Sequence, residues 1–223
     1  MATMDDIARN LGVSKSTVSK ALSGAEDVSA TMRRAVLEKA VELGYSKVSR
    51  HSEAPRIAIF ITNMAYRKPD DFGFDIVMGF RKAAEPAGFH VEIIPLDILM
   101  QQKIRYDEFM VLENFRGGLF LGLSLRDPWL KDFETCRTPA VLYDNHVKGN
   151  ANVTYMGVDN VEGMDMAVEH LISLGHKKSA ISAAVLSPIF LRSAAMRSSM
   201  FWNGTISLPA RNCWAIITIV IFA

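Results

Sequence analysis

Side chains that could bind nucleic acid are concentrated in residues 14–20, which read SKSTVSK. A lysine can donate hydrogen bonds to guanine O6 and N7, a serine can contact several base edges, and hydroxyls can bind phosphates. If this stretch is helical, the apolar residues Val18, Ala21 and Leu22 face inward. The outward face then carries Lys15, Ser16, Ser19 and Lys20. These residue types suit a contact with DNA, although a face that is merely solvated can carry the same types.

Two short helices joined by a tight turn would hold these side chains in place. A first helix is predicted from apolar residues at a spacing of three to four: Met4, Ile7, Ala8 and Leu11. Thr3 and Asp6 form an N-cap pattern at its start, and Gly12 permits the left-handed backbone that ends a helix. Ser14 is placed to cap the second helix. The pattern predicts a helix-turn-helix, a motif whose second helix lies in the major groove of DNA.

A third helix is predicted from Ser29, as its cap, to about Leu43, with Gly44 as its stop. Together, residues 2–46 contain the pattern A-x-x-x-G-V-S-x-x-T-V-S-x-A-L-S-G, then Val-Ser, a long helix and Leu-Gly-Tyr. This combination closely resembles the N-terminal headpiece of the LacI/GalR family of bacterial repressors.

The resemblance implies a sequence-specific DNA-binding transcriptional regulator, a repressor of a metabolic operon, that binds a double-stranded operator as a homodimer. Lys15, Ser16 and Lys20 are expected to contact bases. The DNA backbone is expected to contact a second set: Thr3, Ser14, Thr17, Ser19, Ser29 and Tyr45. The alternative function is a small-molecule binding module, for a sugar or a nucleoside, with a vestigial headpiece.

The charge of the chain indicates specific docking on DNA and not non-specific binding through many basic residues. The whole chain has a net charge of +1, and residues 1–56 carry nine basic and seven acidic residues. So small an excess favours specific docking as a dimer. The two cysteines, Cys136 and Cys213, lie far apart, so we expect no disulfide framework and a reducing cytoplasm. The longest apolar run, residues 214–223, is too short to span a bilayer, and no membrane partner is expected.

Residues 47–55 are polar and lack a hydrophobic period, so we interpret them as a linker between two domains, 1–46 and 56–180. Family members carry an Ala-Arg pair and a Leu here, and the Leu wedges into the minor groove. The segment KVSRHSEA contains neither. We therefore expect little kinking of the operator.

From Arg56 onward, strands alternate with helices. Strands are predicted at 57–62, 89–94, 117–124, 140–144 and 153–158, and helices at 74–87, 101–115, 128–135 and 161–174. We expect Pro86 to bend the first of these helices, and Gly117-Gly118 to form a turn before a strand. The order predicts a mainly parallel α/β sheet covered on both faces. It resembles the first lobe of the periplasmic-binding-protein-like effector domain of the same family.

Ligands of open α/β sheets bind beyond the carboxyl ends of the strands, where Asn63 and Asp159 lie. The resemblance implies that Phe72 and Phe74 stack on a sugar or purine effector and that Asp159 accepts hydrogen bonds from it. For the two phenylalanines, loop or core packing is the alternative. For Asp159, the alternative is a helix cap.

Signals of an enzyme are weak. The five histidines show no metal-ligand spacing, and the sequence contains no GxxxxGK[ST], GxSxG or Cys-His pattern. We therefore expect no catalytic residue, no metal site and no cofactor.

The resemblance stops after about residue 181, where family members continue into a second lobe. No Asp or Glu occurs after Glu169. We interpret residues 181–223 as an atypical tail that truncation or a frameshift would produce, and a real but unusual terminal segment is the alternative. We expect this tail to be poorly ordered or collapsed non-specifically. With only one lobe of a two-lobed cleft, a response to a small-molecule effector is not expected.

Overall fold

The structure is a computed structural model that describes residues 2–45, 54–124 and 126–175, together with three strands nearer the C-terminus. The chain forms two compact units. The first comprises residues 1–123, 127–142 and 147–154, and the second comprises residues 124–126, 143–146 and 155–223. The predicted linker, including the position of the missing hinge pair, lies outside the described residues except for its last two.

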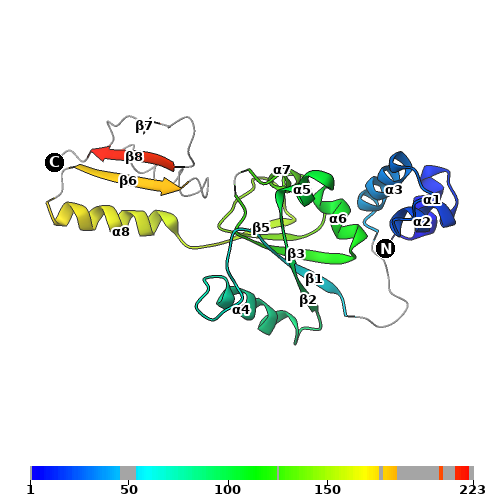
Figure 1. Ribbon diagram of the computed structural model, residues 1–223, viewed down its shortest axis with the longest axis horizontal. Helices are drawn as coiled ribbons and strands as arrows, with labels where there is room; N and C mark the ends of the chain where they lie inside the picture. The colour runs from blue at the N-terminus through cyan, green and yellow to red at the C-terminus, as the bar shows by residue number, and fades with distance from the viewer. Residues whose placement is uncertain are drawn as a thin grey trace. The chain divides into compact units, whose positions relative to one another are not determined.

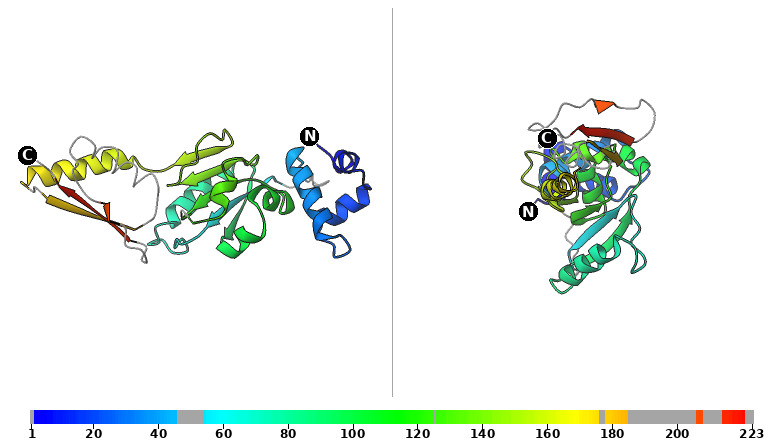
Figure 2. Two further views of the ribbon diagram at one scale, coloured as in Figure 1. Left: turned by 90° about the horizontal axis from the view of Figure 1, so that it is seen from above. Right: turned by 90° about the vertical axis from the view of Figure 1, so that its left-hand side faces the viewer.

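Three helices form the headpiece: α1 (Met4–Leu11), α2 (Lys15–Leu22) and α3 (Ala30–Glu42) (Figures 1 and 2). The predicted caps are confirmed. Thr3 and Asp6 bond reciprocally in a capping box, and the hydroxyl of Ser29 accepts a hydrogen bond from the N–H of Met32. Apolar side chains from all three helices form a small buried core: Ile7, Ala8, Val18, Ala21, Val36 and Ala40.

A five-stranded sheet forms the centre of the α/β part, in the order β2-β1-β3-β4-β5 (Figure 1). The strands are β1 (Arg56–Ile61), β2 (His90–Pro95), β3 (Phe115–Leu121), β4 (Ala140–Tyr143) and β5 (Val153–Met156). Strand β1 pairs in parallel with both β2 and β3, and β3 pairs in parallel with β4. The prediction of a mainly parallel sheet is confirmed.

Helices lie on both sides of this sheet: α4 (Phe74–Ala84) on one side, and α5 (Ile98–Lys103), α6 (Tyr106–Leu112) and α7 (Trp129–Asp132) on the other (Figure 1). The second side holds an aromatic core. The rings of Phe60 and Phe120 stack with centroids 4.6 Å apart, and Trp129 meets Phe60 edge-on at 5.6 Å. Stacked and edge-on rings add to the stabilisation that burial provides.

The single helix predicted at 101–115 is wrong, because the chain forms two helices there. Asp97 caps α5 by accepting a hydrogen bond from the N–H of Met100 at 2.7 Å. The backbone turns extended at Ile104, and the N–H of Tyr106 then bonds to the carboxylate of Asp132 at 2.9 Å. This partner lies 26 residues away, so the break has no local sequence signal. The predicted bend at Pro86 is also wrong, since α4 ends at Ala84.

Gly117 and Gly118 lie inside β3, so the predicted turn is wrong. A Cβ atom on Gly118 would approach the ring of Phe60 to 2.9 Å and that of Phe120 to 3.1 Å. The glycine therefore leaves the room that the two stacked rings occupy.

The second unit contains α8 (Asn160–Ser173) and a three-stranded sheet in the order β6-β8-β7. Strand β8 (Trp214–Val220) pairs antiparallel with β6 (Lys178–Ala184) and with β7 (Ile206–Ser207). For these strands the expected poor order is wrong, because a β-branched run such as residues 216–220 favours extended pairing. The rest of the tail lies outside the described residues. In the described part of the chain, no helix has the length and apolarity needed to cross a membrane.

Candidate nucleic-acid interface

The second helix of the headpiece, α2, begins at a cluster of hydroxyl groups. The backbone between α1 and α2 turns at Gly12, whose φ of 66° lies in the left-handed region that favours glycine. Ser14 then caps α2, as predicted, by accepting a hydrogen bond from the N–H of Thr17 at 3.1 Å. Its hydroxyl also lies 2.7 Å from that of Ser16 and 2.8 Å from that of Thr17. Three hydroxyls therefore surround the positive end of this helix, a place where phosphates bind.

The outward face of α2 is the one that the sequence predicted. Val18 and Ala21 are completely buried. The exposed residues of the helix are Lys15, Ser16, Ser19 and Lys20. Their exposure is confirmed, and their contact with bases or phosphates stays a prediction.

Both lysines of this face form ion pairs with carboxylates from outside α2. Lys15 Nζ lies 2.6 Å from Asp5 Oδ2, which belongs to α1. Lys20 pairs with Asp27, in the loop before α3, and the hydrogen bond from Lys20 is the main reason that the pKa of Asp27 is lowered. Sequence reasoning missed both acids as parts of this face, because Asp5 and Asp27 lie outside α2 and the helical period relates only residues of one helix.

Like Ser14, two more of the predicted backbone-contacting residues already hold structural hydrogen bonds. The Thr3 hydroxyl lies 2.7 Å from Asp6 Oδ2 within the capping box, and the Ser29 hydroxyl caps α3. Both residues are exposed, whereas Thr17 is half-buried.

Tyr45 differs from the other predicted DNA contacts because it belongs to the headpiece core. Its side chain is only 8% exposed and packs in the same cluster as Ala40. Burial also raises the pKa of its hydroxyl. In this position Tyr45 stabilises the headpiece and presents little surface to a phosphate.

The predicted effector residues lie in separate parts of the chain. Asn63, with a φ of 50°, follows β1, and Phe72 and Phe74 end the loop that leads from β1 into α4. Phe72 is 69% exposed, which does not fit packing in a core, and Phe74 is half-buried as the first residue of α4. Asp159 belongs to the second unit, where its carboxylate accepts a hydrogen bond from the N–H of Glu162 at 3.0 Å. The helix-cap interpretation of Asp159 is thus realised, and effector binding stays a prediction.

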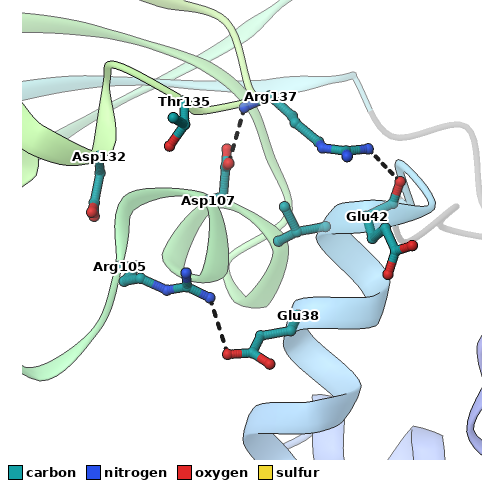
Figure 3. A pocket seen from close by; sticks show the side chains of 8 residues that line it. Glu38, Glu42, Arg105, Asp107, Asp132, Thr135 and Arg137 are labelled. Atoms are coloured by element: carbon teal, nitrogen blue, oxygen red, sulfur yellow. Dashed lines mark hydrogen bonds and ion pairs between the residues drawn. The ribbon is translucent and has the colours of Figure 1, made fainter.

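A pocket of about 330 Å³ lies beside α3, and its charged groups mostly bind one another (Figure 3). Arg105 Nη2 lies 3.3 Å from Glu38 Oε1, and Arg137 Nη1 donates to the carbonyl oxygen of Glu42 at 2.5 Å. The carboxylate of Asp107 accepts the backbone N–H of Arg137 at 2.9 Å. These contacts join α3 to the segments that carry Arg105 and Arg137, so we interpret the pocket as structural. Among the residues that the structure describes, no group of three or more His, Cys, Asp or Glu side chains could hold a metal ion.

The chain is similar in sequence to known regulators of transcription over most of its length. Over 191 residues the chain is 27% identical to the HTH-type transcriptional regulator CelR of Thermobifida fusca, covering 81% of this chain and 55% of CelR. Over 183 residues it is 27% identical to the transcriptional repressor CytR of Escherichia coli K12, covering 79% of this chain and 52% of CytR. The chain therefore spans about half the length of these curated relatives.

Solved structures of similar proteins include the lac repressor dimer bound to operator and the anti-inducer ONPF, at 20% identity and a TM-score of 0.43. That match covers 89% of this chain and 62% of the repressor chain. A complex of CelR with cellobiose is 24% identical with a TM-score of 0.42, over 79% of this chain and 54% of that one.

The headpiece is the part of the chain that a family model matches. Residues 3–47 match the family described as bacterial regulatory proteins, lacI family, and this range contains all three headpiece helices. The headpiece is therefore of the lacI family, and the chain is similar over most of its length to these two regulators of transcription.

Proposed function

We propose that this chain is a sequence-specific DNA-binding regulator of transcription, which reads the major groove with α2. The observation that carries the proposal is the exposed polar face of α2, set on a helix whose opposite side is completely buried in the headpiece core. A helix braced in this way can enter the groove as a rigid body, so its side chains reach base edges at fixed positions.

In this proposal Lys15, Ser16 and Lys20 read bases. A lysine near the start of the helix donates to guanine O6 and N7, and a serine hydroxyl reaches either a donor or an acceptor edge. The hydroxyls of Ser14 and Thr17, beside the positive end of α2, suit a phosphate and would fix the position of the helix in the groove. This division separates contacts that position the protein from contacts that specify the sequence.

The length of α2 supports a homodimer on DNA. Its eight residues give a helix about 12 Å long, at roughly 1.5 Å per residue. At about 3.4 Å per base pair, such a helix reads only about three or four base pairs. Two copies on half-sites about one helical turn apart would double the recognised sequence. We therefore propose a dimer that binds a pseudo-palindromic operator.

The test is a selection from random duplexes with the full chain, repeated with Lys15→Ala and with Ser16→Ala. Each variant should relax the preference at one position of each half-site and lose about 1–3 kcal/mol of binding free energy. Arg34→Ala is the control, because it removes an exposed positive charge from α3 and leaves α2 intact. An unchanged preferred sequence in both α2 variants would show that α2 does not read the bases.

A further inference from the structure

The two lysines of α2 share an unusual arrangement, since each is held by a carboxylate from a neighbouring segment. Asp5 reaches Lys15 from α1, and Asp27 reaches Lys20 from the loop before α3. All four side chains are between 55% and 59% exposed, so the pairs lie on the surface and not in the core. No other residue of α2 carries a charge.

The pairs therefore cancel the positive charge of the helix face that would meet DNA. Non-specific binding to DNA depends on cations that approach phosphates and release counterions. A lysine that already pairs with an aspartate contributes little to that release, and the aspartate repels any phosphate that comes close. Both effects weaken binding to DNA of arbitrary sequence.

Base recognition is affected differently because a lysine ammonium has three N–H donors. One N–H can remain on the aspartate while the others point at guanine O6 and N7. The carboxylate then restrains a long and flexible side chain, so less conformational entropy is lost when the base contact forms. An aspartate can also accept a hydrogen bond from cytosine N4.

We infer that Asp5 and Asp27 are specificity-determining residues of the DNA interface, which hold Lys15 and Lys20 for base contacts and suppress binding to phosphates in general. This inference rests on the proposed function. It assigns a role in DNA recognition to two residues outside α2. Neither role can be predicted from the spacing of residues along the sequence.

The experiment compares Asp5→Asn and Asp27→Asn with Glu26→Gln in the full chain. Glu26 is exposed and adjacent to Asp27, and it is not one of the carboxylates that pair with α2. The control thus removes the same charge from the same part of the molecule. Dissociation constants are measured by fluorescence anisotropy at several salt concentrations, for the duplex selected by the wild type and for an unrelated duplex of equal length.

Each Asp→Asn variant should bind the unrelated duplex about 1.5- to fivefold more tightly, which is the scale of one exposed ion pair. The slope of log affinity against log salt should steepen by about 0.9 for that duplex, as one more cation meets a phosphate. Affinity for the selected duplex should rise by a smaller factor than this, so the specificity ratio falls. Glu26→Gln should leave the ratio unchanged.

Two results would overturn the inference. In the first, the Asp→Asn variants have the same specificity ratio and the same salt slope as Glu26→Gln. In the second, each variant gains affinity equally for the selected and the unrelated duplex. Either result leaves the proposed function standing as long as the wild type selects a sequence. If the wild type selects no sequence at all, the proposed function fails and the inference fails with it. Circular dichroism of each variant should match that of the wild type, since asparagine has the same shape as aspartate.

Discussion

Truncation of Ile7 to alanine should unfold the headpiece and abolish DNA binding, although Ile7 itself faces away from the interface. Ile7 is completely buried and shares the headpiece core with Val18 of α2 and Val36 of α3. Ile→Ala in a core costs about 2–5 kcal/mol, from lost burial and the cavity that remains. At roughly 0.05–0.15 kcal/mol per residue, a unit the size of residues 2–45 has about 2–7 kcal/mol of stability in total. The loss is therefore comparable to the whole stability of the headpiece.

Hydrogen exchange followed by mass spectrometry on the full chain is the suitable assay, because it resolves peptides of α2 from those of the α/β part. Ile7→Ala should lose protection throughout residues 3–45 while β1 and β3 keep theirs. Ile7→Val, which costs only about 0.5–1.5 kcal/mol, should give an intermediate result and retain DNA binding. If Ile7→Ala kept full protection of α2, or bound DNA without that protection, the argument that core packing positions α2 would be refuted.

Two further predictions concern the α/β part. Gly118→Ala should destabilise the chain by about 1–3 kcal/mol in urea unfolding, since the new methyl group would meet the buried ring of Phe60. The control is Gly79→Ala in α4, where nothing lies within 4 Å of the added atom, and it should stabilise the chain by about 0.5–1 kcal/mol. Equal effects of the two substitutions on stability would contradict the packing argument. Burial raises the pKa of the Cys136 thiol from 9.0 to about 12, so above pH 9 the unfolded chain ionises while the folded chain stays protonated. Stability should therefore fall as pH rises from 9 towards 12, by up to about 1.4 kcal/mol per pH unit more than in Cys136→Ala, and parallel pH profiles of the two proteins would refute this.

The headpiece was predictable because its signals are local. The capping box at Thr3 and Asp6, the stop at Gly12 and the cap at Ser14 each act within one turn of helix, so these local signals were enough to predict the start of α1, its end and the start of α2. The outward face of α2 follows from the helical period once these ends are known. For the same reason, the alternation of strands and helices was sufficient to predict the parallel sheet.

Features that depend on partners far away in the sequence could not be predicted and become visible only in the folded chain. Asp132 separates α5 from α6 by binding the N–H of Tyr106, and the rings on either side of Gly118 require a residue without a side chain inside β3. The ion pair of Asp5 with Lys15 belongs to this class, because it joins side chains of two different helices, α1 and α2. A sequence pattern records the preferences of each segment for its own conformation. It does not record which side chains meet when segments pack, and at this interface that meeting sets the charge of the surface offered to DNA.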